Sequence, residues 1–306
     1  MEGKDLLSIA DLTAEDAWRL LRLARDLKQV GARPLLAGRS LALVFEKPSL
    51  RTRVSFDVAM YQLGGHAIYL GPTEVGLGQR ESVTDAARVL SRFVNGIVAR
   101  TFKQSTIEEL ARYATVPVIN ALSDEEHPCQ ALGDVLTVWE HKGDMHGVTL
   151  AYVGDGNNVA NSLLYLAALM GVHIRLASPP GYEVQPERVA WATAVARQSG
   201  ASITLTADPE EAARGADVLY TDVWTSMGQE EETAIRRVAF ARYQIDQRLL
   251  SLARPDALVM HPLPAHHGEE VAPGIVDSPQ SVVFDQAENR LHIQKAILAE
   301  LLTASP

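Results

Sequence analysis

The sequence predicts the α/β fold class, with two doubly wound parallel-sheet domains. The chain has 306 residues, 47 % of them apolar, which suffices for two domains of ordinary size with separate cores. Short apolar runs alternate with helical patterns along nearly the whole chain, as is typical of parallel sheets with helices on both faces. A polar, glycine-containing stretch, His141–Gly147, separates two sets of runs. We therefore predict domains at 1–143 and 144–285, followed by a helical segment at 286–306.

Each predicted strand is a short run rich in apolar and β-branched residues. In the first domain these runs are Leu41–Phe45, Ala67–Leu70, Gly96–Ala99 and Val116–Asn120. In the second domain they are Val148–Val153, His173–Ala177, Ser202–Leu205, Val218–Thr221, Ala257–Met260 and Val282–Phe284. The first helix is expected at Ala14–Val30, with Thr13 as its N-cap. The last helix, Gln286–Leu302, could close the second domain or return to the first.

Composition narrows the class of protein. The net charge of −10 argues against a nucleic-acid partner, which usually requires a basic face. A single cysteine, Cys129, excludes an intrachain disulfide and fits a reducing compartment. Residues 1–5 lack the pattern of a secretory signal, and the longest apolar stretch, Leu163–Val172, is too short to cross a membrane. We expect a cytoplasmic protein that binds no nucleic acid or membrane and acts on a small polar substrate.

The first chemically informative cluster lies where a predicted strand ends and a helix begins, at Ser49-Leu50-Arg51-Thr52-Arg53. Helix N-termini expose backbone N–H groups and a partial positive charge, which suit a phosphate. Ser49 and Thr52 add hydroxyl groups, and the planar guanidinium of Arg51 can bind two phosphate oxygens. The alternative is a capped, solvated helix start.

A second cluster, His127-Pro128-Cys129-Gln130, also starts a predicted helix. A neutral histidine and a glutamine amide can donate to a carbonyl oxygen that gains negative charge during acyl transfer. Arg100, at the end of a predicted strand, could join the same anion site. Taken alone, His127 could equally be structural, and Arg100 could form a surface salt bridge.

The third cluster, Gly154-Asp155-Gly156-Asn157-Asn158, follows a strong predicted strand. It superficially resembles a dinucleotide-binding loop, but position 159 is valine where that pattern requires glycine, so we do not expect nicotinamide or flavin binding. Loops at the carboxyl ends of parallel strands nevertheless bind ligands.

Two further clusters also follow predicted strands in the second domain. In Asp222–Gly228, Asp222 could pair with an ammonium group or could merely cap a turn. The segment His261–Glu270 invites a metal-site interpretation, but its spacing matches no established ligand pattern. Leu263 precedes a proline, which favours an extended backbone whose carbonyls could face a substrate.

In order, these clusters resemble motifs of the aspartate/ornithine carbamoyltransferase family over essentially the whole chain. Ser49–Arg53 resembles the family's Ser-Thr-Arg-Thr-Arg motif, and His127–Gln130 resembles its His-Pro-x-Gln motif. Asp222–Gly228 is similar to the Asp-x-x-x-Ser-Met-Gly motif of ornithine-specific members, and His261–Pro264 resembles their His-Cys-Leu-Pro loop. The ornithine-specific members are the closest match.

The resemblance implies carbamoyl transfer from carbamoyl phosphate to the δ-amine of L-ornithine, giving citrulline and phosphate, with no metal or organic cofactor. The implied phosphate-binding residues are Ser49, Leu50, Arg51 and Thr52. The residues implied to hold and polarise the carbamoyl group are Arg100, His127 and Gln130. Pro128, Cys129 and Arg290 are also implied to bind carbamoyl phosphate. The residues implied for ornithine are Asn158, Asp222, Ser226, Met227, Pro262 and Leu263. Arg53 is assigned to an internal ion pair. The family also implies that the C-terminal helix packs on the first domain and that the chain forms a homotrimer or a multiple of trimers.

Three positions depart from the family pattern. Leu50 stands where threonine is common, which matters little if the residue contributes its N–H. Gly76 stands where many ornithine-specific members carry a glutamine that reaches a neighbouring subunit's substrate, and Gln79 or Arg80 could substitute. Pro262 replaces a cysteine near the reacting amine, so we expect backbone carbonyls of Pro262 and Leu263 to bind the amine instead.

Alternative functions remain open at this point. The His-Pro-Leu-Pro form of the loop is that of the aspartate-specific members, whereas Ser226-Met227-Gly228 offers no basic group for a second carboxylate. Putrescine and N-acetylornithine are further acceptors to weigh, as is a non-catalytic carbamoyl-phosphate-binding paralogue. Ser226–Glu232 is the segment that we would expect to act as a mobile lid.

Overall fold

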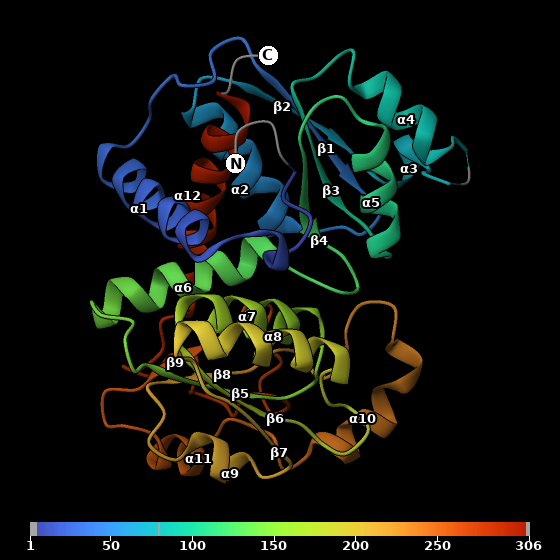
Figure 1. Ribbon diagram of the computed structural model, residues 1–306. Coiled ribbons are helices and arrows are strands. Elements are labelled where there is room, and N and C mark those ends of the chain that lie inside the picture. Colours follow the sequence, from blue (N-terminus) through green and yellow to red (C-terminus); the bar gives the residue numbers. More distant parts are fainter. Residues whose placement is uncertain (1–4, 79, 304–306) are drawn as a thin grey trace. The chain divides into compact units, whose positions relative to one another are not determined.

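The structure is a computed structural model that describes residues 5–78 and 80–303 (Figure 1). It divides into two compact units: the first extends to Leu136 and resumes at Glu288, and the second is Thr137–Ala287. Two helices, α6 (Pro128–Lys142) and α12 (Val283–Leu302), therefore belong in part to each unit. The expected boundary at 143/144 corresponds to the end of α6, whereas the division falls inside that helix.

Within the described residues, the first unit contains a four-stranded parallel sheet with the order β2-β1-β3-β4. Its strands are β1 (Ser40–Phe45), β2 (His66–Leu70), β3 (Gly96–Arg100) and β4 (Val118–Leu122). The chain runs from β1 to β2 on one side and then returns to β3 on the other side of β1. Loops at the carboxyl ends of strands diverge at such a reversal, which is where ligands bind in open α/β sheets.

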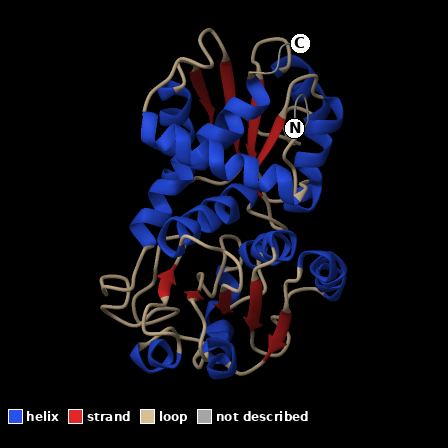
Figure 2. Cartoon of the chain, turned by 60° about the vertical axis from the view of Figure 1, so that its left-hand side comes forward, coloured by secondary structure: helices blue, strands red, loops and turns tan. Residues whose placement is uncertain are grey.

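Helices cover both faces of this sheet (Figure 2). Besides parts of α6 and α12, they are α1 (Ala14–Val30), α2 (Leu50–Gln62), α3 (Pro72–Val75), α4 (Val83–Leu90) and α5 (Gln104–Tyr113). The chain also forms a short 3₁₀ turn, Ile9–Asp11. One face of β1, carrying Ala42 and Val44, packs in a core cluster with residues of α4 and α5. The predicted first helix is confirmed, because α1 has the expected bounds and the Thr13 side chain caps it.

The second unit has a five-stranded parallel sheet in its described residues, with the order β7-β6-β5-β8-β9. Its strands are β5 (Thr149–Val153), β6 (His173–Ala177), β7 (Ile203–Thr206), β8 (Val218–Tyr220) and β9 (Leu258–Met260). Its helices are α7 (Asn158–Met170), α8 (Pro186–Ser199), α9 (Pro209–Ala213), α10 (Thr233–Phe240) and α11 (Gln247–Leu252), with a 3₁₀ turn at Glu230–Glu232. Here the direction of winding reverses between the neighbouring strands β5 and β8.

The C-terminal helix returns to the first unit, as the resemblance implies. The buried ammonium group of Lys295 on α12 donates to the carbonyl oxygens of Leu27 and Gly31 at the carboxyl end of α1, at 3.1 and 3.0 Å. A cation at this end of a helix binds its unsatisfied carbonyl groups and interacts favourably with its dipole. The predicted fold class, two doubly wound parallel-sheet domains with a returning C-terminal helix, is confirmed.

One predicted strand, Val282–Phe284, is wrong. Val283 is already the first residue of α12, and only an isolated bridge pairs Ser281 with Val259 of β9. Val282 and Val283 are buried, so their apolar character is used at a helix start rather than in a strand. A short apolar run does not by itself distinguish these two outcomes.

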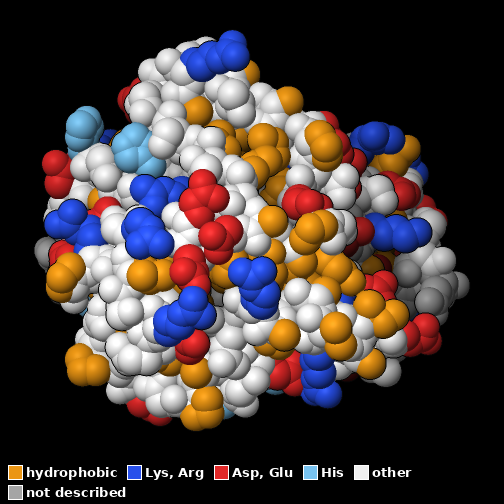
Figure 3. Space-filling view, turned by 90° about the horizontal axis from the view of Figure 1, so that it is seen from below, with side chains coloured by type: hydrophobic (Ala, Val, Ile, Leu, Met, Phe, Trp, Pro, Cys, Tyr) orange, Lys and Arg blue, Asp and Glu red, His pale blue; other side chains and the backbone are white. Residues whose placement is uncertain are grey.

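The outer surface carries both signs of charge. On the face shown in Figure 3, basic and acidic side chains are interspersed with apolar ones, and no broad area has one sign. Ion pairs in the second unit include Lys142 with Asp256 and Arg254 with Asp217. No helix among the described residues has the length and apolar character needed to span a bilayer.

Candidate active site

The loop after β1 leads into the first turn of α2, where the phosphate cluster was predicted. Ser49 is the N-cap of α2, and its hydroxyl oxygen accepts a hydrogen bond from the Thr52 N–H at 3.3 Å. The Leu50 side chain is 75 % exposed. A large apolar side chain left in solvent adds little to the fold, so the backbone N–H of Leu50 at the helix start is its useful group.

The late arginine lies beside this helix start. Arg290 on α12 is buried and donates from Nη2 to the Thr52 hydroxyl oxygen at 2.6 Å. Close packing of α12 against α6 makes this approach possible, because a Cβ added at Gly133 would lie 3.4–3.6 Å from Arg290 atoms. Sequence reasoning did not single out Gly133, since a glycine inside a predicted helix has no local signal of such a contact.

Three arginines and a histidine lie near one another at the carboxyl edge of the first sheet, because the charges of the arginines affect the pKa values of Arg100 and His127. Arg100, the last residue of β3, is buried, and burial followed by the charges of Arg290 and Arg51 lowers its pKa to about 10. His127 is also buried, and burial followed by the charges of Arg290, Arg100 and Arg51 lowers its pKa well below the usual value. Its imidazole is therefore neutral at pH 7 and can donate from one nitrogen. An anion entering this cluster would relieve the repulsion among its positive charges.

The remaining members of the second cluster are fixed by the core. Pro128 begins α6, a position that suits a residue without an N–H. The Gln130 side-chain amide donates to the Asp134 carboxylate at 2.8 Å. Cys129 is buried, with its thiol 3.5 Å from the Asn120 carbonyl oxygen, and burial raises its pKa to about 12. The thiol is therefore a core group, and only the backbone of Cys129 is available to a ligand.

One position that departs from the family pattern, Gly76, and its two possible substitutes, Gln79 and Arg80, follow α3 in the sequence. Gly76 ends α3 in a left-handed conformation, with φ of 55°, which glycine adopts readily. Arg80 is exposed and donates to the Glu74 carbonyl oxygen at 3.2 Å, whereas Gln79 lies outside the described residues.

Arg53, expected to form an internal ion pair, is instead exposed, and its guanidinium lies 3.9 Å from the ring centroid of Tyr69. A position two residues after Arg51 on a helix points to a different side, which explains the difference.

In the second unit, the loops after β5 and β8 meet because these strands are neighbours. The buried Asp222 carboxylate accepts from the Asn157 side-chain amide at 2.8 Å and from the Val223 N–H at 2.8 Å. Asn158, the residue assigned to ornithine, is the first residue of α7 and is half-buried. Ser226 is half-buried and Met227 is 48 % exposed in the following segment. The structure thus brings Asn158 and Asp222 to the same edge of the sheet.

A buried arginine, Arg236, contacts residues near both ends of Ser226–Glu232, the segment that was expected to be a lid. The Arg236 guanidinium on α10 donates from Nη1 to Asp155 and to the Trp224 carbonyl oxygen, both at 3.0 Å, and from Nε to Glu232 at 2.8 Å. Despite these partners, burial raises the pKa of Asp155 to about 6. Arg236 was not identified from the sequence, because nothing local marks a helical arginine as the partner of an acid 81 residues away.

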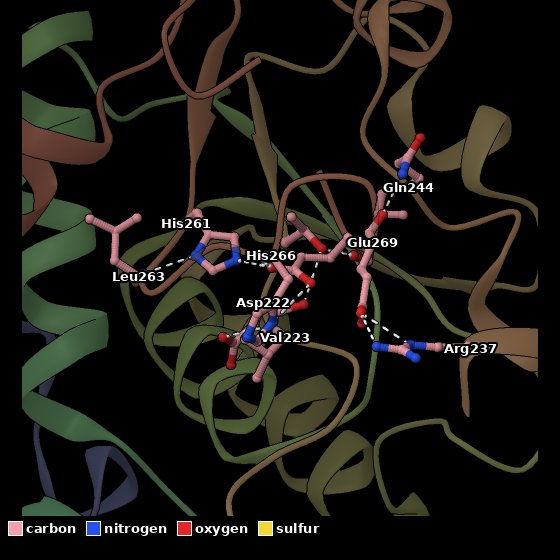
Figure 4. Close-up of polar contacts among 11 residues, drawn as sticks. Asp222, Val223, Arg237, Gln244, His261, Leu263, His266 and Glu269 are labelled. Carbon is pink, nitrogen blue, oxygen red and sulfur yellow. Dashed lines mark hydrogen bonds and ion pairs between the residues drawn. The ribbon is translucent and has the colours of Figure 1, made fainter. Parts of the chain in front are cut away.

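The His-Pro-Leu-Pro loop after β9 is held by a buried histidine and glutamate (Figure 4). The His261 Nδ1 atom accepts from the Leu263 N–H at 2.9 Å, and its Nε2 atom lies 3.1 Å from Glu270 Oε1. Since a backbone N–H can only donate, the proton of the neutral imidazole is on Nε2 and points to Glu270. Glu270 also accepts from the His266 N–H at 2.6 Å.

The predicted extended backbone at Leu263 is wrong. Leu263 has φ of 56° and is followed by a cis peptide bond to Pro264. Its N–H also donates to the buried His261 ring at 2.9 Å, which holds the start of this residue in place. A leucine in the left-handed region is strained, and such residues are retained where surrounding contacts impose them.

The same loop brings together a cluster that spacing alone did not suggest. One ligand atom each from His266, Glu269 and Glu270 lies within 4.8 Å of the others, as a cation site would require. Both carboxylates have protein partners, however: Glu269 pairs with Arg237 at 2.6 Å, and Glu270 with His261. Arg237 compensates the charge of Glu269, and Glu270 already accepts hydrogen bonds from the His261 ring and the His266 N–H, so these groups are engaged within the protein.

Comparisons with known proteins assign the two halves of the chain to one family. The family described as "Aspartate/ornithine carbamoyltransferase, carbamoyl-P binding domain" matches residues 4–140, and the one described as "Aspartate/ornithine carbamoyltransferase, Asp/Orn binding domain" matches residues 146–301. The chain is similar to the anabolic ornithine carbamoyltransferase of Pyrococcus furiosus, with 52 % identity over 98 % of this chain and 96 % of that protein. The ornithine carbamoyltransferase of Acidothermus cellulolyticus is 56 % identical over 99 % of this chain and 97 % of its own length.

A solved structure extends this likeness to three dimensions. The ornithine carbamoyltransferase structure from Pyrococcus furiosus matches with a TM-score of 0.97 at 50 % identity, covering 100 % of this chain and 99 % of that one. The motifs of both units and the returning helix α12 occur together in one chain that follows this fold throughout. The chain therefore belongs to the aspartate/ornithine carbamoyltransferase family.

Proposed function

We propose that this chain transfers the carbamoyl group of carbamoyl phosphate to the δ-amine of L-ornithine, releasing citrulline and phosphate. The observation that carries the proposal is the cluster of Arg51, Arg100 and Arg290 around a neutral His127 at the carboxyl edge of the first sheet. Such a cluster suits a small, highly charged anion with a carbonyl group. The names of the relatives indicate ornithine as the acceptor. Asp222 offers a carboxylate that could bind its ammonium group.

We assign the donor substrate to the first unit. The N-terminus of α2 holds the phosphate through Ser49, the backbone of Leu50, and Arg51, which is near the other arginines of the cluster. Four residues act on the carbamoyl oxygen: Thr52, Arg100, His127 and Gln130. Arg290 binds the Thr52 hydroxyl. Because His127 is neutral, it stabilises a developing oxyanion by donating a hydrogen bond rather than by carrying a full charge.

We assign the acceptor to the second unit. Asp222 and Asn158 take the α-amino group, and Ser226 and Met227 take the α-carboxylate, in part through backbone N–H groups. The turned backbone at Leu263 presents the carbonyls of Pro262 and Leu263 to the δ-amine in place of a cysteine side chain. The His261–Glu270 pair keeps that backbone in its conformation.

In the reaction, the lone pair of the neutral δ-amine attacks the carbamoyl carbon. The bond from that carbon to the bridging phosphate oxygen breaks, and the departing phosphate accepts the proton that the amine loses. An alkylammonium has a pKa of about 10.4, so only about 1 in 2,500 amines is neutral at pH 7. The rate should therefore rise with pH, and a profile that is flat from about pH 6 to 9 while chemistry is rate-limiting would contradict this mechanism.

The experiment that tests the proposal supplies the purified protein with carbamoyl phosphate and, separately, ornithine, aspartate, N-acetylornithine or putrescine. Citrulline formed with ornithine, and no product of comparable rate with the others, is the expected result. Preference for another acceptor would replace ornithine while leaving the donor site intact. Binding of carbamoyl phosphate without turnover of any amine would support the non-catalytic paralogue and direct attention to Gly76 and Pro262.

The assembly and location complete the proposal. We expect a homotrimer or a multiple of trimers, as the family resemblance implies. Light scattering of the purified protein measures this directly, and a monomer at working concentration would overturn it. We place the protein in the cytoplasm, where its one buried thiol, Cys129, stays reduced.

A further inference from the structure

Asn157, the residue before α7, has no role in the function proposed so far, yet it makes an unusual set of hydrogen bonds. Its Oδ1 atom accepts from the Val159 N–H at 2.9 Å, the Ala160 N–H at 3.1 Å and the Tyr152 hydroxyl at 3.2 Å. Its Nδ2 atom donates to the Asp222 carboxylate at 2.8 Å. We propose that Asn157 is a positioning residue that fixes Asp222 to receive the α-amino group of the acceptor, an inference that rests on the proposed function.

The orientation of the Asn157 amide is determined by its neighbours. Backbone N–H groups are obligatory donors, so the atom that faces Val159 and Ala160 must be the oxygen. The nitrogen must then face Asp222, whose ionised carboxylate can only accept. The helix start therefore forces an N–H donor toward the carboxylate, and no rotation of the amide can withdraw it without breaking the cap.

Few residues could serve both purposes. Serine, threonine and aspartate cap helices as well as asparagine does, but none of them presents a rigid NH₂ group on the far side of the capping oxygen. An aspartate at this position would keep the cap and place a second carboxylate oxygen against Asp222. Helix formation alone therefore does not explain an asparagine here, whereas the bond to Asp222 does.

The fold makes this contact rigid. Asn157 follows β5 and Asp222 follows β8, and these neighbouring parallel strands pair Tyr152 with Tyr220. The Thr221 hydroxyl also donates to the Val153 carbonyl oxygen at 2.6 Å, which ties the ends of the two strands. The two side chains are thus held at adjacent strand ends, where open α/β sheets bind ligands.

Asp222 needs donors because its surroundings disfavour a charge. Burial raises its pKa, Glu270 adds to this effect, and His261, the Val223 N–H and the Asn157 amide oppose it. Asp155 and the Tyr152 hydroxyl also lie nearby, since Asp222 affects the pKa of both. Among these groups, only the Asn157 amide bonds to Asp222 Oδ2, the oxygen that the backbone N–H does not hold. Removing it should both loosen the carboxylate and favour its protonated form.

The test compares Asn157→Asp and Asn157→Ser with the wild-type enzyme. Both variants keep a capping oxygen for α7, so the melting temperature should change little. In each, we expect KM for ornithine to rise about tenfold or more, because a hydrogen bond to a charged group is lost, while KM for carbamoyl phosphate stays within about twofold. In Asn157→Asp, two adjacent carboxylates share a proton, so the acid limb of kcat/KM for ornithine should move to higher pH.

A matched control is Asp246→Asn, the same exchange of carboxylate and amide at the N-cap of α11, where Asp246 accepts from the Leu249 N–H at 2.7 Å. It should leave ornithine kinetics unchanged. Wild-type kinetics and an unshifted pH profile in Asn157→Asp would overturn the inference. So would equal losses for both substrates together with a lowered melting temperature, since that pattern marks a merely structural residue. Failure of the wild-type enzyme to carbamoylate ornithine would instead overturn the proposed function.

Discussion

The two units bury charges of opposite sign at the same place in their folds, the carboxyl edge of a parallel sheet where the winding reverses. In the first unit, burial and the charges of Arg290 and Arg51 lower the pKa of Arg100, and burial and all three arginines lower that of His127. In the second unit, the buried charged groups are mainly carboxylates. The difference predicts which ligand each edge attracts: a compact anion in the first, and a group with an ammonium in the second.

The acids of the second unit are not equivalent to one another. Asp155 is compensated by the guanidinium of Arg236, and Glu270 is bound by His261. Asp222 is held by two neutral donors, the Asn157 amide and the Val223 N–H. A carboxylate stabilised only by neutral donors can gain from a ligand cation, so we expect Asp222 rather than Asp155 to receive the ammonium group of the acceptor.

The strongest test of the cationic edge is Arg51→Ala. It should lower kcat/KM for carbamoyl phosphate about 10²–10³-fold, because a guanidinium that binds the transferring group is lost. The unliganded protein should not melt at a lower temperature, since repulsion within the cluster is relieved, but its stabilisation by carbamoyl phosphate should disappear. Arg53→Ala is the matched control, because Arg53 is exposed and lies on the Tyr69 ring. Undiminished activity in Arg51→Ala would mean that the cationic edge of the first unit does not bind the anionic substrate.

The second test concerns internal compensation in the acidic unit. Arg236→Met leaves Asp155 buried without its cation and should destabilise the protein by about 3–5 kcal/mol in urea unfolding. Adding Asp155→Asn should restore part of this loss. The neighbouring Arg237→Met breaks only an exposed pair with Glu269 and should cost about 1 kcal/mol or less. If Arg236→Met and Arg237→Met lowered the free energy of unfolding equally, the distinction between the buried and the exposed ion pair would be contradicted.

The third test uses pH to measure what the cationic edge does to His127. Its folded-state pKa is depressed, so the unfolded chain binds a proton that the folded one does not, and stability is lost as pH falls below about 6.5. The contribution should be about 1.4 kcal/mol per pH unit below that value. His127→Gln should flatten the dependence measured by denaturant unfolding between about pH 7 and 5.5, whereas exposed His146→Gln should not. Parallel curves for wild type and His127→Gln would refute the depressed pKa.

The smallest expected effect is at Cys129. Burial raises the pKa of its thiol to about 12, so no thiolate is available at pH 8 despite the positive charges nearby. Iodoacetamide should leave the folded enzyme unmodified by mass spectrometry and fully active, and should modify it once unfolded. Rapid alkylation of the folded protein would mean that the segment His127–Gln130 is open to solvent, and that the edge of the first sheet is not buried as described.

The local sequence pattern determined much of the secondary structure of this protein. The helix Ala14–Val30 and its Thr13 cap follow from apolar spacing and a capping residue within one turn. The ends of the strands could also be predicted, because the hydrophobic period changes there, and the chemically informative motifs were found at these ends. Two local predictions failed: Val282–Phe284 is too short a run to identify its element, and Leu263 has a φ of 56° although the proline after it favours an extended residue.

Tertiary structure alone decided which of these motifs act together. Asn157 and Asp222 are 65 residues apart, and only the placement of β5 beside β8 makes one the donor to the other. Asparagine after a strand and before a helix predicts a cap, but the sequence contains no sign of the second bond. Likewise, the sequence left open where the last helix packs, and the contacts of α12 in the first unit bring Arg290 to Thr52. Spacing within a turn is set by backbone geometry, whereas contacts across the chain depend on strand order, which local residues do not encode.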